Sequence, residues 1–204
     1  MSNKRLLAID PSLTCSGWAL FAVGTEDLVG VGKIRSLKPG IPLARRLDDL
    51  QTKIEDLLEQ LKLVSNDVLI CESQTTMRDP GAAFKVEQVR GIFESVARGR
   101  GIEVPGRINP RSVQYELMGL TGRQVKRQQV KLNAVQTVER LYRESLLRIG
   151  FNCETAALIR HQDIVDAILV GSLALTRLKT AQLTSTPLAE MFVERARTRR
   201  LKYA

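Results

Sequence analysis

The sequence predicts a mixed α/β domain. Three apolar runs near the N-terminus, residues 4–10, 16–24 and 27–35, are joined by short glycine-containing connections that are typical of antiparallel hairpins. A helical pattern at 42–63 and a further apolar run at 67–72 follow. A chain that passes from hairpins into alternating helices and strands is expected to pack its helices against a mixed sheet.

The helix over residues 42–63 and the strand over residues 67–72 have the clearest patterns. Apolar side chains return every three or four positions in the helix, namely at Leu43, Leu47, Leu50, Ile54, Leu57, Leu58 and Leu61. In the strand, Val68 to Cys71 are all apolar. A run without polar alternation is typical of a strand covered on both faces, so we expect it at the centre of the sheet.

The rest of the chain predicts one edge strand and several helices. Residues 102–108 predict the strand, and Pro105 places it at an edge because proline cannot donate to a neighbouring strand. Helices are expected at about 82–98, 125–147 and 162–178, with a short one opened by Asn109-Pro110. We expect residues 1–180 to form the domain and residues 181–204 a basic C-terminal tail.

Composition excludes several classes of protein. The chain has 204 residues, of which 44% are hydrophobic and 26% charged, which is ordinary for a globular protein with a full core. No apolar run approaches the roughly 20 residues that a membrane span needs, and the N-terminus does not have the pattern of a signal peptide. Three isolated cysteines predict neither a zinc site nor a disulfide framework, and a reducing cytoplasmic setting is expected.

The positive charge is unevenly distributed along the chain. Residues 1–106 carry equal numbers of basic and acidic side chains, so the whole net charge of +9 falls on residues 107–204. Such asymmetry favours a polyanionic partner, although a solvated basic surface with no partner has the same composition.

Four carboxylates are candidates for one metal site. Asp10 and Glu72 each end an apolar run that predicts a strand, and Asp163 and Asp166 share one face at the start of the last long helix. Burying an unpaired carboxylate is costly, and a hard cation such as Mg²⁺ takes carboxylate and phosphate oxygens as ligands. Taken singly, Asp163 could equally cap the helix and Asp10 could belong to a turn.

These segments together resemble the RuvC family of Holliday junction resolvases, which have an RNase H-like fold. The segment from Asp10-Pro11-Ser12 to Gly17-Trp18 resembles the family's opening motif, with Ser12 in place of the usual glycine. Ile70-Cys71-Glu72 resembles its strand-ending glutamate, residues 83–91 its next helix, and residues 163–167 its Asp-x-x-Asp-Ala motif. The likeness spans residues 4–175 and implies a mixed five-stranded sheet, with three antiparallel strands plus parallel strands, flanked by helices.

The resemblance implies a Mg²⁺-dependent endonuclease that resolves four-way DNA junctions by paired nicks. Asp10, Glu72, Asp163 and Asp166 would hold two Mg²⁺ ions per active site, roughly 4 Å apart, with Mn²⁺ able to substitute. A four-way junction has two-fold symmetry, so a homodimer is expected in the cytoplasm of a bacterial or phage-infected cell. The apolar face of helix 82–98 would supply the dimer contact through Phe84, Val86, Val89, Ile92 and Phe93.

Basic side chains between the glutamate and the closing helix are the candidate DNA contacts. Arg127-Gln-Gln-Val130 fits a Lys-x-x-Val setting of the family with arginine substituted. Thr75 stands where bacterial members place an aromatic wedge, and Met77 is the nearest large apolar side chain. The residues expected to contact phosphate are Arg78, Arg111, Arg123, Lys126, Arg127 and Lys131, with Arg107 in the same basic tract.

Two alternatives remain open at this point. The same fold serves nucleases that act on other branched DNA or on RNA–DNA hybrids, and the departure at Thr75 bears on that choice. A noncatalytic nucleic-acid-binding protein could also keep the fold. His161, the one histidine, is either a proton carrier or a residue at the start of the last helix, and the second interpretation is preferred.

Overall fold

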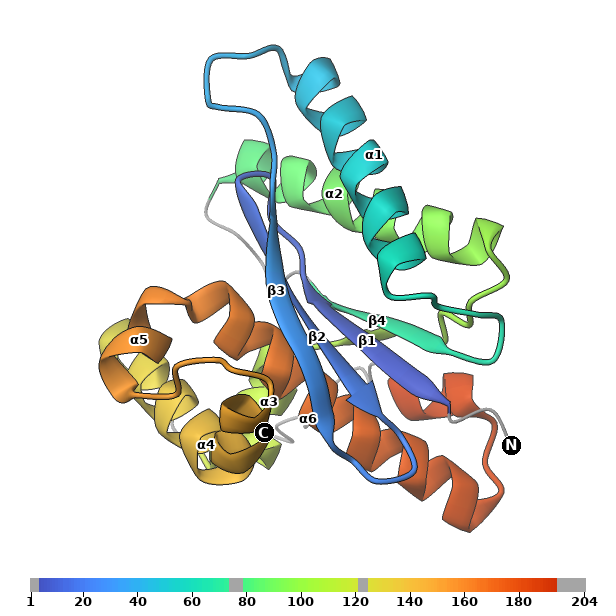
Figure 1. Ribbon diagram of the computed structural model, residues 1–204, viewed down its shortest axis with the longest axis vertical. Coiled ribbons are helices and arrows are strands. Elements are labelled where there is room, and N and C mark those ends of the chain that lie inside the picture. Colours follow the sequence, from blue (N-terminus) through green and yellow to red (C-terminus); the bar gives the residue numbers. More distant parts are fainter. Residues whose placement is uncertain (1–3, 74–78, 121–124, 194–204) are drawn as a thin grey trace, which may run out of the picture.

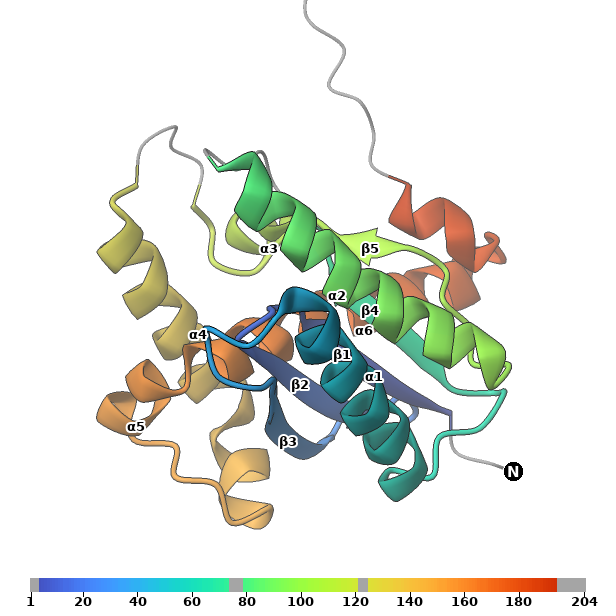
Figure 2. The same ribbon diagram turned by 90° about the horizontal axis from the view of Figure 1, so that it is seen from above.

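The computed structural model describes residues 4–73, 79–120 and 125–193. A central sheet lies between two helical layers (Figure 1). Helices α1 (Leu43–Gln60) and α2 (Pro80–Gly99) cover one face, and the layer that contains α6 (Gln162–Thr184) covers the other, as the view from above in Figure 2 also shows. None of the described helices is long and apolar enough to cross a membrane.

The sheet has five strands in the order β3-β2-β1-β4-β5. Their bounds are β1 (Arg5–Asp10), β2 (Cys15–Ala22), β3 (Leu28–Arg35), β4 (Val68–Glu72) and β5 (Arg107–Ile108). The first three pair antiparallel, and β4 lies parallel to β1 and to β5. The expected mixed five-stranded sheet is confirmed, and β4, as its apolar run indicated, has a neighbour on each side.

The fifth strand is much shorter than the expected span of 102–108. Only Arg107 and Ile108 form a ladder with β4, and Glu103 makes one isolated bridge to Val68. Pro105 separates the two contacts and has no N–H to donate. The edge position was predicted correctly, but the length was wrong.

The second helical layer differs from expectation in two elements. It contains α3 (Pro110–Glu116), α4 (Arg127–Arg148) and α5 (Thr155–Arg160), and α5 was not predicted. Helix α6 continues to Thr184, past the boundary expected at residue 180. A 3-10 turn, η1 (Leu188–Phe192), then packs back on α6 and buries Phe192. The expected basic tail beyond it, residues 194–204, lies outside the described residues.

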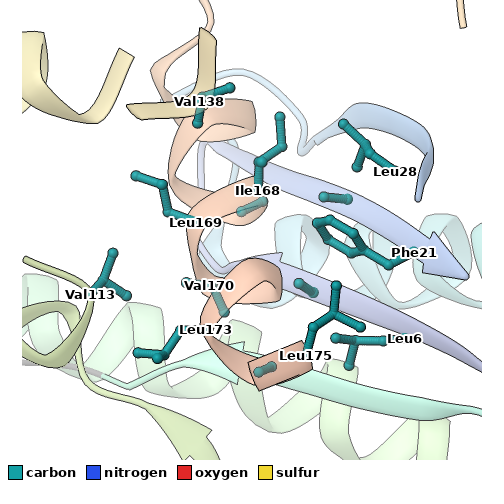
Figure 3. Packing of buried hydrophobic residues seen from close by; sticks show 14 of the residues in the cluster. Leu6, Phe21, Leu28, Val113, Val138, Ile168, Leu169, Val170, Leu173 and Leu175 are labelled. Atoms are coloured by element: carbon teal, nitrogen blue, oxygen red, sulfur yellow. The ribbon is translucent and has the colours of Figure 1, made fainter. Parts of the chain in front are cut away.

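Helix α6 packs closely against the sheet. Figure 3 shows Phe21 of β2 beside Ile168 and Leu175 of the helix, with Leu6 and Leu28 nearby. Gly171 permits this approach, because a Cβ at that position would stand 2.1 Å from the Phe21 ring. The tight seating of α6 fixes where its N-terminal turn meets the sheet.

The opposite face of the sheet packs on α1 and α2. Val89 and Phe93 of α2 are fully buried there, which corrects their assignment to a dimer surface, because these side chains fill the core of one chain. Val86 and Ile92 are partly buried, and Phe84 is 64% exposed. The apolar face of α2 is therefore divided between the core and solvent.

Candidate active site

One row of residues crosses the sheet at the end of β1. Asp10 pairs with Gly17 of β2, and Gly17 pairs with Lys33 of β3. On the other side, Ile9 pairs with Cys71 of β4, so Asp10 and Glu72 are the next residues of the two parallel strands. Because directly opposed residues share a face of a sheet, the pairing places Lys33 on the face that carries Asp10.

Gly17 admits the start of α6 to this row. A Cβ on Gly17 would lie 1.9 Å from the carbonyl oxygen of Asp163 and 2.9 Å from the backbone nitrogen of Ile164. Only a residue without a side chain fits, so the first turn of α6 rests directly on β2. Gly17 lies within β2, and its missing side chain is what allows α6 to dock against this strand.

The turn that follows Asp10 is closed by a serine hydroxyl. Ser16 Oγ accepts from the backbone nitrogen of Ser12 and donates to the carbonyl oxygen of Ser12, both at 2.9 Å. Among the described residues other than glycine, only Glu26, Lys62 and Ser185 have positive φ. Ser12 thus has a backbone conformation that does not need the glycine usual in the family.

The first two turns of α6 carry the other two carboxylates. Asp163 Oδ2 accepts from Lys33 Nζ at 2.8 Å, and Asp166 Oδ1 accepts from Gln162 Nε2 at 3.1 Å. The N-cap residue of α6 is His161, which makes no side-chain capping bond. The carboxylate of Asp163 therefore meets a lysine of the sheet and does not serve as the N-cap, which answers the capping alternative.

The four carboxylates lie within electrostatic reach of one another. The pKa of Asp10 is raised well above its ordinary value by burial, and further by the charges of Glu72, Asp166 and Asp163. Burial and the charge of Asp166 raise the pKa of Glu72 to about 8. The carboxyl groups of Asp10 and Glu72 also lie within hydrogen-bonding reach of each other, and a hydrogen bond between them would require a proton. The site therefore holds on to protons near neutral pH.

Basic residues of α4 face the acids of α6. Burial raises the pKa of Asp166 to about 6, and the charges of Lys131 and Arg127 act in the opposite direction. Arg127 and Lys131 are both exposed on α4. Two of the basic residues expected to contact DNA thus lie close enough to Asp166 to affect its titration.

This donor set suits a hard cation. No group of three or more histidine, cysteine, aspartate or glutamate side chains within residues 4–73, 79–120 and 125–193 is arranged to hold a metal ion as it stands. The contacts explain this, because Asp163 is directed to Lys33, Asp166 to Gln162, and Asp10 to Glu72. Partly buried carboxylates that lie within electrostatic reach of one another are nonetheless a donor set for Mg²⁺ or Mn²⁺, whose charge would offset their repulsion.

The remaining candidate DNA contacts divide into three groups. Arg111 on α3 and Lys126 at the N-cap of α4 are exposed. Arg107 donates to both oxygens of Glu94, at 2.7 and 3.0 Å, so this contact ties β5 to α2. Arg78 and Arg123, like Thr75 and Met77, lie outside the described residues.

Two other side chains border the site. His161 stands immediately before α6 with its ring edge-on to Phe151, and burial and the charge of Lys33 lower its pKa. It therefore occupies a helix start, as preferred. The pKa of the Cys15 thiol is raised, chiefly by burial, and Arg35 and Asp163 lie within its hydrogen-bonding reach.

Lys33 and the close approach at Gly17 were missed by reasoning from the sequence. Lys33 interrupts a run of valine and glycine in its strand, which is the only local signal that it differs from its neighbours. Its nearness to Asp163 depends on the register of β2 with β3 and on the docking of α6. Neither the register nor the docking can be predicted from a contiguous stretch of sequence.

Comparison with curated proteins relates the chain to one enzyme family. It is 30% identical over 129 residues to the crossover junction endodeoxyribonuclease RuvC of Nitratidesulfovibrio vulgaris (strain DP4), covering 62% of this chain and 74% of the relative. It is 28% identical over 117 residues to the enzyme of the same name from Endomicrobium trichonymphae, covering 56% and 59% of the two chains. No family model matches the sequence.

Solved structures share the fold. Thermus thermophilus RuvC aligns with a TM-score of 0.61 at 20% identity, and its complex with a Holliday junction substrate with 0.60 at 19%, each over 88% of this chain and 96% of the other. The fowlpox virus Holliday junction resolvase aligns with a TM-score of 0.51 at 14% identity, over 84% and 98%. The chain shares the fold of RuvC, and its 30% identity to one RuvC enzyme extends over 74% of that enzyme. It therefore belongs to the RuvC family of crossover junction endodeoxyribonucleases.

Proposed function

We propose that this chain resolves four-way DNA junctions by hydrolysing one phosphodiester bond in each of two strands. The observation that carries the proposal is the acidic end of the β1–β4 pair. Burial raises the pKa of both Asp10 and Glu72 there; the charge of Asp166 raises both further, and the charges of Glu72 and Asp163 also raise that of Asp10. A cluster of this kind in a member of a junction-cleaving family is best explained as a metal site for phosphodiester cleavage.

The proposed ligands are Asp10, Glu72, Asp163 and Asp166, and the proposed occupants are two Mg²⁺ ions, for which Mn²⁺ can substitute. When bound, such cations supply the Lewis acidity that activates a water and stabilises the leaving 3′-oxygen. The chain's own residues would hold these ions between rigid elements. The sheet fixes two of the ligands, and the seating of α6 on Gly17 fixes the other two.

DNA would approach across the N-terminal end of α4. Arg127 and Lys131 are exposed there and act electrostatically on Asp166, so a phosphate bound to them would lie beside the acids. The exposed Arg111 and Lys126 would extend this contact, and Arg78 and Arg123 are further candidates from the sequence. Phosphate contacts of this kind position the backbone without reading base sequence.

Two paired nicks require two active sites, so we propose that the protein acts as a homodimer with the two-fold symmetry of its substrate. Phe84, 64% exposed at the start of α2, is the apolar side chain of the expected dimer surface that the core leaves free. The expected setting is the cytoplasm of a bacterial or phage-infected cell.

The test is nicking of a labelled four-way junction by wild type and by Asp10→Asn, in Mg²⁺ and in EDTA. We expect paired symmetric nicks that need both the metal and Asp10, while Asp10→Asn still binds the junction. Asp56→Asn, at an exposed site on α1, is the matched control and should cleave normally. Full activity of Asp10→Asn would refute the site, and tight binding with no cleavage by wild type would indicate a binding protein on this fold.

A second substrate class follows from Thr75. The family's aromatic wedge is replaced there by a small polar residue, which favours action on a wider range of branched DNA. Comparing four-way, three-way and flapped DNA, linear duplex and an RNA–DNA hybrid in one assay separates a strict resolvase from a general branched-DNA nuclease.

A further inference from the structure

Lys33 introduces a positive charge beside the acidic site. Its ammonium nitrogen lies 2.8 Å from Asp163 Oδ2, although the two residues are far apart in the sequence. The side chain of Lys33 is 14% exposed and that of Asp163 is 35% exposed. The pair thus lies at the open border of the site, where solvent reaches the carboxylate more readily than the lysine.

The register of the sheet places Lys33 beside the site. Lys33 stands opposite Gly17, and Gly17 stands opposite Asp10, so the position between the lysine and the first acid carries no side chain. The backbone of Asp163 fills that position instead. Lys33 is therefore placed by strand register, and its contact with Asp163 is built into the fold more firmly than a contact between two flexible surface side chains.

An ammonium group and a divalent cation compete for the same carboxylate. Asp163 Oδ2 bonded to Lys33 is less available as a ligand, and the positive charge of Lys33 repels a second cation at that end of the site. The repulsion falls when a negative group approaches Lys33. A phosphate of bound DNA is the obvious such group, because lysine binds phosphate readily as a point charge.

We propose that Lys33 is a positioning residue that makes cation binding at Asp163 depend on DNA. In the free protein, Lys33 neutralises Asp163 and weakens the binding of the cation that uses this carboxylate. When DNA binds, the ammonium moves to a phosphate and Asp163 becomes free to ligate. This inference rests on the proposed function, because it assumes that the four acids form the metal site.

The first experiment measures Mn²⁺ binding to the intact protein without DNA, by calorimetry and by loss of the free Mn²⁺ electron paramagnetic signal. Lys33→Gln should bind its weakest Mn²⁺ at least roughly tenfold more tightly than wild type, since a unit charge a few ångströms away is removed. Lys33→Arg keeps the charge and should resemble wild type. Lys53→Gln removes a charge paired with Asp49 at 2.7 Å on α1 and should also leave Mn²⁺ binding unchanged.

The second experiment repeats the titration with Ca²⁺ in the presence and absence of a four-way junction, with the DNA verified as intact on a gel. The difference between wild type and Lys33→Gln should be present without DNA and should close when the junction is bound. A difference that persists in the complex overturns the transfer of the ammonium to phosphate.

The possible results distinguish a failure of the role of Lys33 from a failure of the proposed metal site. If wild type and Lys33→Gln bind Mn²⁺ equally well and Asp10→Asn does not bind it, the role of Lys33 is overturned and the metal site stands. Mn²⁺ binding that none of these substitutions alters overturns the metal site as well. Thermal denaturation of each variant shows whether a change in binding reflects a change in folding.

Discussion

Replacing Glu72 by glutamine is expected to change how the stability of the metal-free protein depends on pH. The pKa of Glu72 is about 8 in the folded protein against 4.5 ordinarily. Between these values the folded chain keeps a proton that the unfolded chain has released. The retained proton stabilises the folded protein at low pH. This contribution to the free energy of unfolding is lost as pH rises, by about 1.36 kcal/mol for each pH unit per proton.

From about pH 5.5 to about pH 7.5 this single proton corresponds to roughly 3 kcal/mol of lost stability. Glutamine has no proton to lose, so Glu72→Gln should gain about that much relative to wild type over the interval. The neighbouring acid does not compensate, because the charge of Glu72 is itself one of the causes that raise the pKa of Asp10. Losing that charge moves Asp10 toward its ordinary value.

The assay is urea unfolding in EDTA at both pH values for wild type, Glu72→Gln and the control Glu59→Gln, which alters an exposed glutamate of α1. The control should follow wild type. Added Mg²⁺ should stabilise wild type more at the higher pH, because binding must displace fewer protons there. Parallel stability curves for wild type and Glu72→Gln would refute the reasoning about the buried acids.

Three further predictions test the packing and the charges of the site. Gly17→Ala forces α6 away from β2 and should lower junction nicking by about 100-fold or more, whereas Gly24→Ala, where a Cβ meets nothing within 4 Å, should nick normally. Lys131→Ala should reduce the slope of log Kd against log salt concentration by about one unit in junction-binding titrations, and Lys53→Ala should not. Asp67→Ala removes a fully buried carboxylate that accepts from the backbone and side chain of Arg5; it should cost about 3 kcal/mol in urea unfolding, and a loss below about 1 kcal/mol would contradict the buried pairing.

The sequence was informative wherever a contiguous pattern determines the structure. Strands β1 to β4, helices α1 and α2, and the ends of the two apolar runs at Asp10 and Glu72 follow from local periodicity and composition. Because the parallel strands β1 and β4 end at the same edge of the sheet, those two acids could be expected to meet. The DNA contacts within 74–78 and 121–124 stay predictions.

Most of the features that were missed depend on pairing between distant segments. Nothing near Lys33 in the chain indicates that Asp163 is its partner. Arg107 belongs to the basic tract, and only the docking of α2 brings Glu94 to its guanidinium. Val89 and Phe93 share a helical face with residues assigned to the dimer, and only the docking of α2 on the sheet shows that they are buried.

The docking of α6 on Gly17 has a consequence for the time at which the protein can first cut DNA. The proposed ligands come from residue 10, residue 72 and the segment 163–166, so the last two join only after most of the polypeptide has been synthesised. A nascent or truncated chain that lacks α6 contains the first two acids but no complete cation site. An unfinished copy of the chain would therefore lack the complete site proposed for phosphodiester cleavage.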